Sequence, residues 1–168
     1  MIAYVETLER VSPQNLSSLK QLVRSITLAQ GQFCLILACC NQSQLQRQMI
    51  KQLRRLPELH LEELMLESST ETLYSTIARH FHSYSPDGVM VYGFESVRHL
   101  SQLLIATNHV REEFRNFKFP VVLWVNDDVM KQFVRLVPDF FSWASTGIEF
   151  VDEHKSLESQ QVLVSHHS

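Results

Sequence analysis

The sequence is poor in glycine and proline, with 4 Gly and 5 Pro in 168 residues. Collagen-like, fibrous and low-complexity chains are rich in these residues, so the composition excludes those classes. The sequence also lacks an apolar run of the roughly 18 residues that a membrane-spanning helix needs. What remains is a globular protein, since 45% of its residues are hydrophobic and can fill a core of ordinary size.

A surplus of positive charge is missing as well. The chain has 15 Lys and Arg against 18 Asp and Glu, a formal net charge of −3, so we expect no nucleic-acid or membrane partner. The first ten residues lack the basic and apolar regions of a secretory signal. The three cysteines all lie within residues 34–40, too close together for a disulfide framework. Together these features predict a cytoplasmic protein.

Apolar runs and amphipathic segments alternate along the chain. Runs without a polar face predict buried strands at residues 33–38, 89–92 and 119–125, and weaker patterns predict strands at 60–66 and 148–151. Helical spacing predicts helices at residues 14–30, 42–55, 69 or 70 to 83, 96–117 and 128–137. This alternation predicts a three-layer α/β fold, in which a five-stranded, mostly parallel sheet has helices on both faces. Residues 1–154 are expected to form one domain, and residues 155–168 a polar tail or linker.

Ligands of open α/β sheets bind at the carboxyl ends of the strands. A phosphate-binding loop after the first strand needs glycines, a lysine, and a Ser or Thr for Mg²⁺. The glycines and the lysine are missing here, which predicts a degenerate loop without nucleotide chemistry and without a cofactor. The residues of this loop are Ala38, Cys39, Cys40, Asn41, Gln42 and Ser43.

Two acidic residues follow the next buried strands. Glu95 and Asp127 could together hold a hard cation through oxygen ligands if their strands are neighbours. Both also stand where helices are expected to begin, and helix capping with the helix dipole accounts for them without a metal. We favour capping.

Cysteine and histidine give a second possible chemistry. Cys39 or Cys40 would lie at a helix N-terminus and could act as a nucleophile with His80 or His82 as its base. No oxyanion hole is evident, and cysteine is often a small buried hydrophobe, which is the interpretation we favour. The two histidines are two residues apart on a helix and do not share a face, so they make a poor metal pair.

Two further patterns concern surfaces. Basic residues gather on the second helix, where we favour a solvated face over nucleic-acid binding because no aromatic residues are interleaved: Arg47, Lys51, Arg54 and Arg55. Aromatic residues crowd the segment after Pro138, where they either plug the edge of the sheet, which we favour, or anchor a partner protein: Phe140, Phe141 and Trp143.

A resemblance rests on two stretches, FPVVLWV at residues 119–125 and VPDFFSW at 137–143. They resemble the signature FPxVLWV…APDFWSW of AAA-like and STAND-type NTPase domains in bacterial, notably cyanobacterial, multidomain proteins. The resemblance implies a P-loop NTPase-like strand order, with the strand at Phe119 between those at Phe33 and Val89. It puts the degenerate loop at the Walker A position, Glu95 near the Walker B acid and Asn126 near the sensor, while Gly93 stands near an expected Mg²⁺-binding Asp.

The resemblance implies a fold that has lost its nucleotide chemistry, with further domains following the tail. We therefore expect a non-catalytic regulatory or protein-interaction domain with a protein partner. One alternative is a residual nucleotide-binding or NTP-hydrolysing domain. The other is a receiver-like signalling domain, in which the strand at Phe33 would lie directly beside the strand at Val89.

Overall fold

The computed structural model describes residues 11–145 and 147–152, so the predicted tail at residues 155–168 lies outside the described residues. One all-parallel sheet has the strand order β2-β3-β4-β1-β5. Its strands are β1 (Leu35–Cys40), β2 (Leu61–Met65), β3 (Gly88–Tyr92), β4 (Val121–Val125) and β5 (Ile148–Phe150). All five strands correspond to predicted ones.

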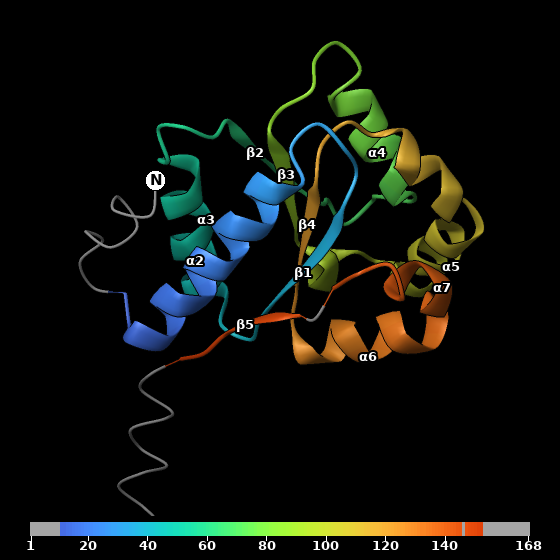
Figure 1. Ribbon diagram of the computed structural model, residues 1–168. Coiled ribbons are helices and arrows are strands. Elements are labelled where there is room, and N and C mark those ends of the chain that lie inside the picture. Colours follow the sequence, from blue (N-terminus) through green and yellow to red (C-terminus); the bar gives the residue numbers. More distant parts are fainter. Residues whose placement is uncertain (1–10, 146, 153–168) are drawn as a thin grey trace, which may run out of the picture.

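Helices cover both faces of this sheet, which confirms the predicted three-layer α/β fold (Figure 1). One face carries α2 (Pro13–Leu28) and α3 (Ser43–Arg54). The other face carries α4 (Leu73–His80), α5 (Leu100–His109), α6 (Asp127–Leu136) and α7 (Pro138–Phe141). None of the described helices is long and apolar enough to cross a membrane.

The position of β4 distinguishes between the topologies considered from the sequence. It pairs with β1 through Leu35–Val121 and its successors, and with β3 through Val89–Val121. The strand thus lies between β1 and β3, where the sequence prediction placed it. The direct β1–β3 neighbourhood of a receiver-like sheet is not formed in the described sheet, so the receiver alternative is wrong about this pairing.

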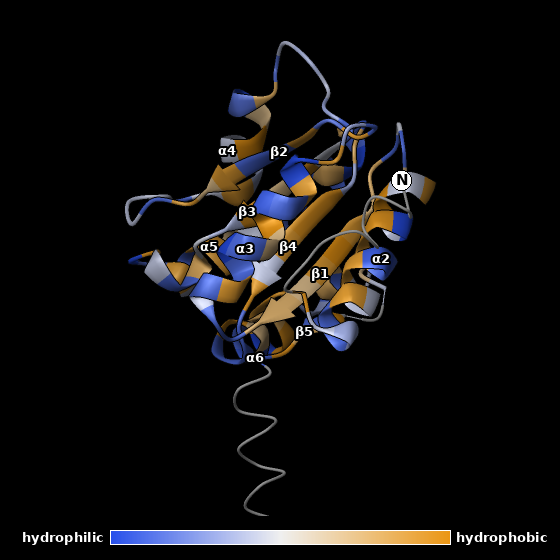
Figure 2. Ribbon diagram, turned by 90° about the vertical axis from the view of Figure 1, so that its left-hand side faces the viewer, coloured by the Kyte–Doolittle hydropathy of each residue, from blue (hydrophilic) through white to orange (hydrophobic). Residues whose placement is uncertain are grey.

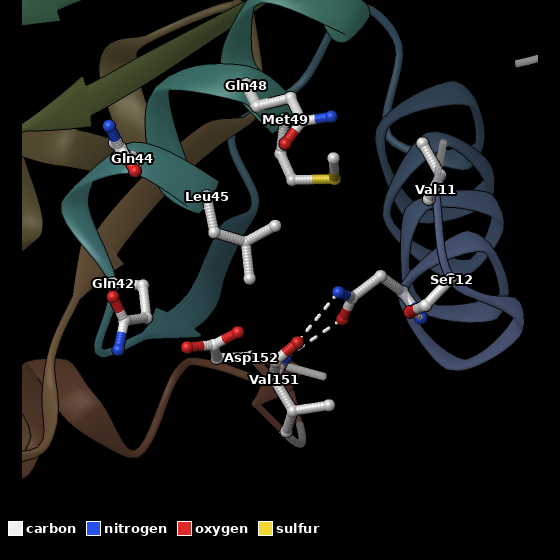
Figure 3. Close-up of a pocket in the computed structure, with 10 residues that line it drawn as sticks. Val11, Ser12, Gln42, Gln44, Leu45, Gln48, Met49, Val151 and Asp152 are labelled. Atoms are coloured by element: carbon white, nitrogen blue, oxygen red, sulfur yellow. Dashed lines mark hydrogen bonds between the residues drawn. The ribbon is translucent and has the colours of Figure 1, made fainter. Parts of the chain in front are cut away.

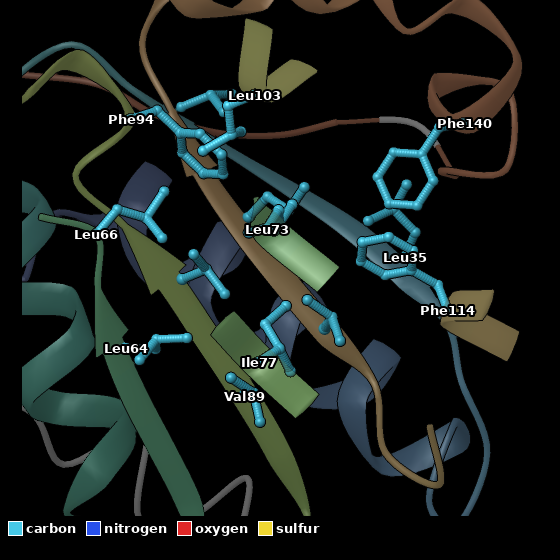
Figure 4. Close-up of a cluster of buried hydrophobic side chains, with 14 of the residues drawn as sticks. Leu35, Leu64, Leu66, Leu73, Ile77, Val89, Phe94, Leu103, Phe114 and Phe140 are labelled. Atoms are coloured by element: carbon cyan, nitrogen blue, oxygen red, sulfur yellow. The ribbon is translucent and has the colours of Figure 1, made fainter. Parts of the chain in front are cut away.

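Strict alternation along the central strands builds two separate cores, because successive side chains of a strand point to opposite faces. In β1, Leu35 and Leu37 face α4 to α7, while Ile36 and Ala38 face α2 and α3. The larger core, in Figure 4, contains Phe94, Phe114 and Phe140, each fully buried. In Figure 2 the strands are mostly orange, whereas the turns of α3 that face the viewer are blue. The hydrophobic effect therefore acts on both faces of the sheet.

Two predicted helices differ from the structure. The single helix expected at residues 96–117 is replaced by a 3-10 turn (Phe94–Ser96), α5 and a second 3-10 segment (Arg111–Asn116). The helix expected from Ser69 or Thr70 begins only at Leu73. Thr70 accepts a hydrogen bond from the Glu67 N–H through its hydroxyl (2.9 Å), so it closes a local turn instead of capping the helix.

Side chains of α2 hold β5 at one edge of the sheet. Asn15, only 3% exposed, donates its amide N–H to the carbonyl of Val151 (2.8 Å) and accepts the Val151 N–H through its amide oxygen (2.9 Å). The hydroxyl of Ser18 donates to the carbonyl of Glu149 (2.6 Å). Backbone groups on this edge of a short strand are therefore hydrogen-bonded, which protects the edge from pairing with another chain.

The Asn15 contact gives a stability prediction. Asn15→Ala leaves partly buried backbone groups of Val151 without the Asn15 side chain as their partner, so we expect the free energy of unfolding to fall by about 1–3 kcal/mol. Gln14→Ala, at the exposed neighbouring position, is the matched control and should lie within about 0.5 kcal/mol of the parent. Urea unfolding measures both variants, and equal stability of the two would contradict the role given to Asn15.

Candidate functional site

The turn from β1 into α3 is where the resemblance placed a phosphate-binding loop. It consists of Asn41 and Gln42 alone, since α3 begins at Ser43. Gln42 stands at the N-cap position, but its side chain makes no capping hydrogen bond. Its carbonyl accepts the Gln46 N–H (3.0 Å) and the Cys40 thiol (3.3 Å). A two-residue turn without glycine is too short to wrap backbone N–H groups around a phosphate.

A side-chain pair joins the ends of β1 and β4. The amide N–H of Asn41 donates to the Asp127 carboxylate (3.0 Å), and the backbone N–H of Asp127 donates to the amide oxygen of Asn41 (2.9 Å). Next to this pair, the amide oxygen of Asn126 accepts the Val129 N–H (2.8 Å) and so caps α6. The side chains of Asn126 and Asp127, at the start of α6, are thus both hydrogen-bonded within the protein.

Gly93 follows β3 in the left-handed conformation, with φ of 94°. A Cβ atom there would lie 3.0 Å from the backbone oxygen of Leu66, so any side chain would force the backbone to move. The resemblance places an Mg²⁺-binding aspartate near this position. The segment after β2 lies so close to Gly93 that an aspartate side chain at this position would contact the Leu66 backbone.

The weak metal candidates are not assembled into a metal site. Glu95 lies in the 3-10 turn after β3, and both it and Asp127 are exposed. Within residues 11–145 and 147–152, no three or more His, Cys, Asp or Glu residues gather as metal ligands. Asp127 and Asp128 occupy the first turn of α6, so the helix dipole favours their negative charges. The residue that caps α6 is Asn126, and the Asp127 carboxylate accepts its hydrogen bond from the Asn41 side chain, so the helix dipole rather than capping accounts for Asp127.

The Cys39 thiol is in an environment that opposes nucleophilic chemistry. Burial, with smaller contributions from the nearby charges of Glu149 and Asp127, raises its pKa from the ordinary 9.0 to about 11. Burial raises the pKa of Cys40 as well, although backbone hydrogen bonds of Gln42 and Gln46 act against that rise. Both cysteines are therefore neutral thiols near pH 7, and a neutral thiol is a poor nucleophile. The histidines proposed as bases, His80 and His82, are exposed at the end of α4.

This environment of Cys39 makes stability depend on alkaline pH. Because the folded-state pKa lies above the unfolded-state value, folding favours the protonated thiol, and the associated stability is present below pH 9. It is lost as the pH rises from 9 to about 11. We expect Tm to fall over this interval and to fall less in Cys39→Ala. Thermal unfolding monitored by circular dichroism measures both, and identical pH profiles would contradict the prediction.

The aromatic segment after Pro138 forms α7 and packs on the larger core. Phe140 is fully buried, with its ring centroid 4.6 Å from that of Phe114. Trp143 is partly buried against Phe33 and Phe140, and the Arg115 guanidinium lies over its ring at 4.4 Å. Phe140 is therefore part of the core on one face of the sheet and cannot anchor a partner from this position.

The two aromatic positions should differ in their effect on stability. Phe140→Ala opens a cavity in the larger core and should cost about 3–5 kcal/mol. Trp143→Ala should cost less, because part of its ring surface already faces solvent. Guanidinium unfolding gives both values. A Trp143→Ala variant at least as destabilised as Phe140→Ala would contradict this ranking.

A pocket opens between α2, α3 and the end of β5 (Figure 3). Its volume is about 260 Å³, and Leu45 and Met49 extend into it from α3, opposite Val11 and Ser12. Its polar lining comes from neutral side chains and one carboxylate: Ser12, Asn15, Gln42, Gln44, Gln48 and Asp152. This pocket is not evident from the sequence, because its walls come from three segments that only the strand order brings together.

A second concave surface lies between α3 and the strands β2 and β3. Its volume is about 450 Å³, and Tyr92, at the end of β3, lies among its basic side chains. The helical spacing of the cations was visible in the sequence, but the neighbouring phenol was not. Its lining residues are Arg47, Ile50, Lys51, Arg54, Arg55, Glu63 and Tyr92.

Comparisons with known proteins found no matching family model, curated protein or solved structure.

Proposed function

We propose that the chain is a cytoplasmic, non-catalytic regulatory or protein-interaction domain on a degenerate P-loop NTPase-like fold. The observation that carries the proposal is the junction between β1 and α3, where Asn41 is hydrogen-bonded to Asp127. An NTPase needs backbone N–H groups and a lysine at this place to hold phosphates. In this chain the side chains of Asn41 and Asp127 occupy that junction, and the Asp127 carboxylate repels an anionic ligand.

The strand order and Gly93 give further support. The position of β4 between β1 and β3 agrees with the order that the sequence resemblance implies for a P-loop NTPase. A Cβ atom at Gly93 would lie 3.0 Å from the backbone oxygen of Leu66, which disfavours an Mg²⁺-binding side chain at this position. Function resides in particular sites and not in the fold itself, so a domain that has lost its nucleotide site can still act through another part of its surface. We propose that this part binds another protein.

Residual nucleotide binding is the competing function. Ligands of open α/β sheets bind at the carboxyl ends of the strands, so we consider the pocket between α2, α3 and the end of β5 as the nucleotide site. Its lining residues in the described chain include no Lys or Arg, and Asp152 is the charged residue among them. A triphosphate carries several negative charges and would be repelled by a carboxylate in this lining. The composition of the pocket therefore favours the non-catalytic proposal.

The proposal predicts that nucleotides do not stabilise the fold. A ligand at 100 times its dissociation constant adds about 2.7 kcal/mol, which a thermal melt detects easily. We expect no change in Tm with millimolar ATP or GTP and Mg²⁺, and no phosphate release. Asp152→Lys is the comparison variant, because it replaces the carboxylate of the pocket with a cation. Any effect of nucleotide on Tm should be larger in this variant than in the parent protein. A clear rise in the Tm of the parent protein with either nucleotide, retained when the exposed cations Arg47 and Lys51 are both replaced by Gln, would contradict the proposal.

A further inference from the structure

The exposed flank of α3 carries a regular row of cations, defined here as the α3 basic groove. Arg47, Lys51 and Arg55 follow one another at intervals of four residues, and Arg54 lies beside them. Residues four apart on a helix are neighbours. The row therefore continues along one side of the helix and faces the surface formed by Tyr92 and Glu63.

These cations are only partly neutralised within the protein. Arg54 lies 3.7 Å from a carboxylate oxygen of Glu62 and 3.9 Å from one of Glu63, which are long distances for ion pairs. Glu62 also contacts His60, at 2.8 Å. No carboxylate of the described chain pairs with Arg47, Lys51 or Arg55. The groove thus keeps an excess of positive charge on a protein whose net charge is −3.

This arrangement costs stability within the helix. Like charges four residues apart destabilise a helix by about 0.2–0.5 kcal/mol for each pair, and the row contains two such pairs, Arg47 with Lys51 and Lys51 with Arg55. The helix dipole compensates Lys51 and Arg54 in the last turn but does not reach Arg47. An external anion along the groove would relieve the repulsion at every position.

The groove also has an apolar floor. Ile50 is 3% exposed below the cations, and Tyr92 is partly buried against the same core. Burial raises the pKa of Tyr92 and so does Glu63, whereas Arg54 and Arg47 act to lower it, because their guanidinium groups lie within electrostatic reach of the phenol. Met65, which follows Glu63 on the edge strand β2, is 60% exposed. A ligand here would meet apolar surface and cations together.

We infer that the α3 basic groove binds an acidic segment of a partner protein, with its carboxylates on the unpaired cations and an apolar side chain against Tyr92. This inference rests on the proposed function and names the chemistry of its partner. The groove is one helix long, which suits a short peptide segment better than a continuous phosphate backbone. It also offers one aromatic ring, not the series on which single-stranded nucleic acid stacks.

Fluorescence anisotropy with a fluorescein-labelled octaglutamate peptide tests this inference on the full chain. At about 50 mM salt, where exposed charges are weakly screened, we expect saturable binding that weakens as salt is added. The variant Arg47→Gln/Lys51→Gln should lose at least about tenfold in affinity. Its Tm should be unchanged or slightly higher, because a repulsive pair is removed.

The matched control is Lys131→Gln/Arg135→Gln on α6. It removes the same charge at the same four-residue spacing from exposed positions on the opposite face of the sheet. Affinity for octaglutamate should stay within about twofold of the parent. Equal losses in the two variants would show attraction to charge in general and would overturn the inference.

Two other results would also overturn it. One is the absence of peptide binding to the parent protein, and the other is tighter binding of an oligothymidylate with the same number of charges. Neither result bears on the proposed function, which fails if nucleotide with Mg²⁺ raises the Tm of the parent and of Arg47→Gln/Lys51→Gln alike. A rise in Tm that is lost in this variant reports anion binding in the groove. The two failures are therefore distinguishable.

Discussion

The pairing of β1 with β4 is the contact from which most of the structure follows. Five residue pairs, from Leu35–Val121 to Cys39–Val125, join segments that are far apart in the chain. Closing so long a loop is entropically costly, and burial on both faces of the two strands offsets the cost. The same register points Leu37 and Leu123 into one core and Ala38 and Trp124 into the other. It also brings Asn41 within hydrogen-bonding distance of Asp127.

The sequence predicted the layers of this fold because its physical signals were local. Central strands buried on both faces are continuously apolar, as in β3 and β4. The helices predicted from residues 14 and 128 start within one residue of those positions, where Ser12 accepts the Asn15 N–H and Asn126 accepts the Val129 N–H. In the structure α2 and α6 begin directly after these residues. The basic face of α3 was also predictable, because Arg47, Lys51 and Arg55 are four residues apart in the sequence.

The errors arose where local patterns do not determine the outcome. Leu103, Leu104, Phe114 and Phe117 all pack on one core, so their spacing imitates a single helix although the backbone changes to a 3-10 conformation after His109. Contacts at the carboxyl edge depend on which strands are neighbours, and apolar periodicity contains no such information. The Asn41–Asp127 pair and the pocket beside α3 therefore required the three-dimensional structure.

The distribution of charge explains why anion binding would move away from the ordinary place in an α/β sheet. Helix N-termini at the carboxyl edge normally attract anions. Here α6 begins with its own Asp127 and Asp128, and the turn before α3 provides no glycine or lysine. Arg47, Lys51 and Arg55, which have no carboxylate partner among the described residues, lie instead along the flank of α3, in the groove that Tyr92 also lines. A net charge of −3 hides this separation, since the sum of charges says nothing about their position. An acidic ligand would therefore be repelled at the strand ends and attracted to the side of the sheet.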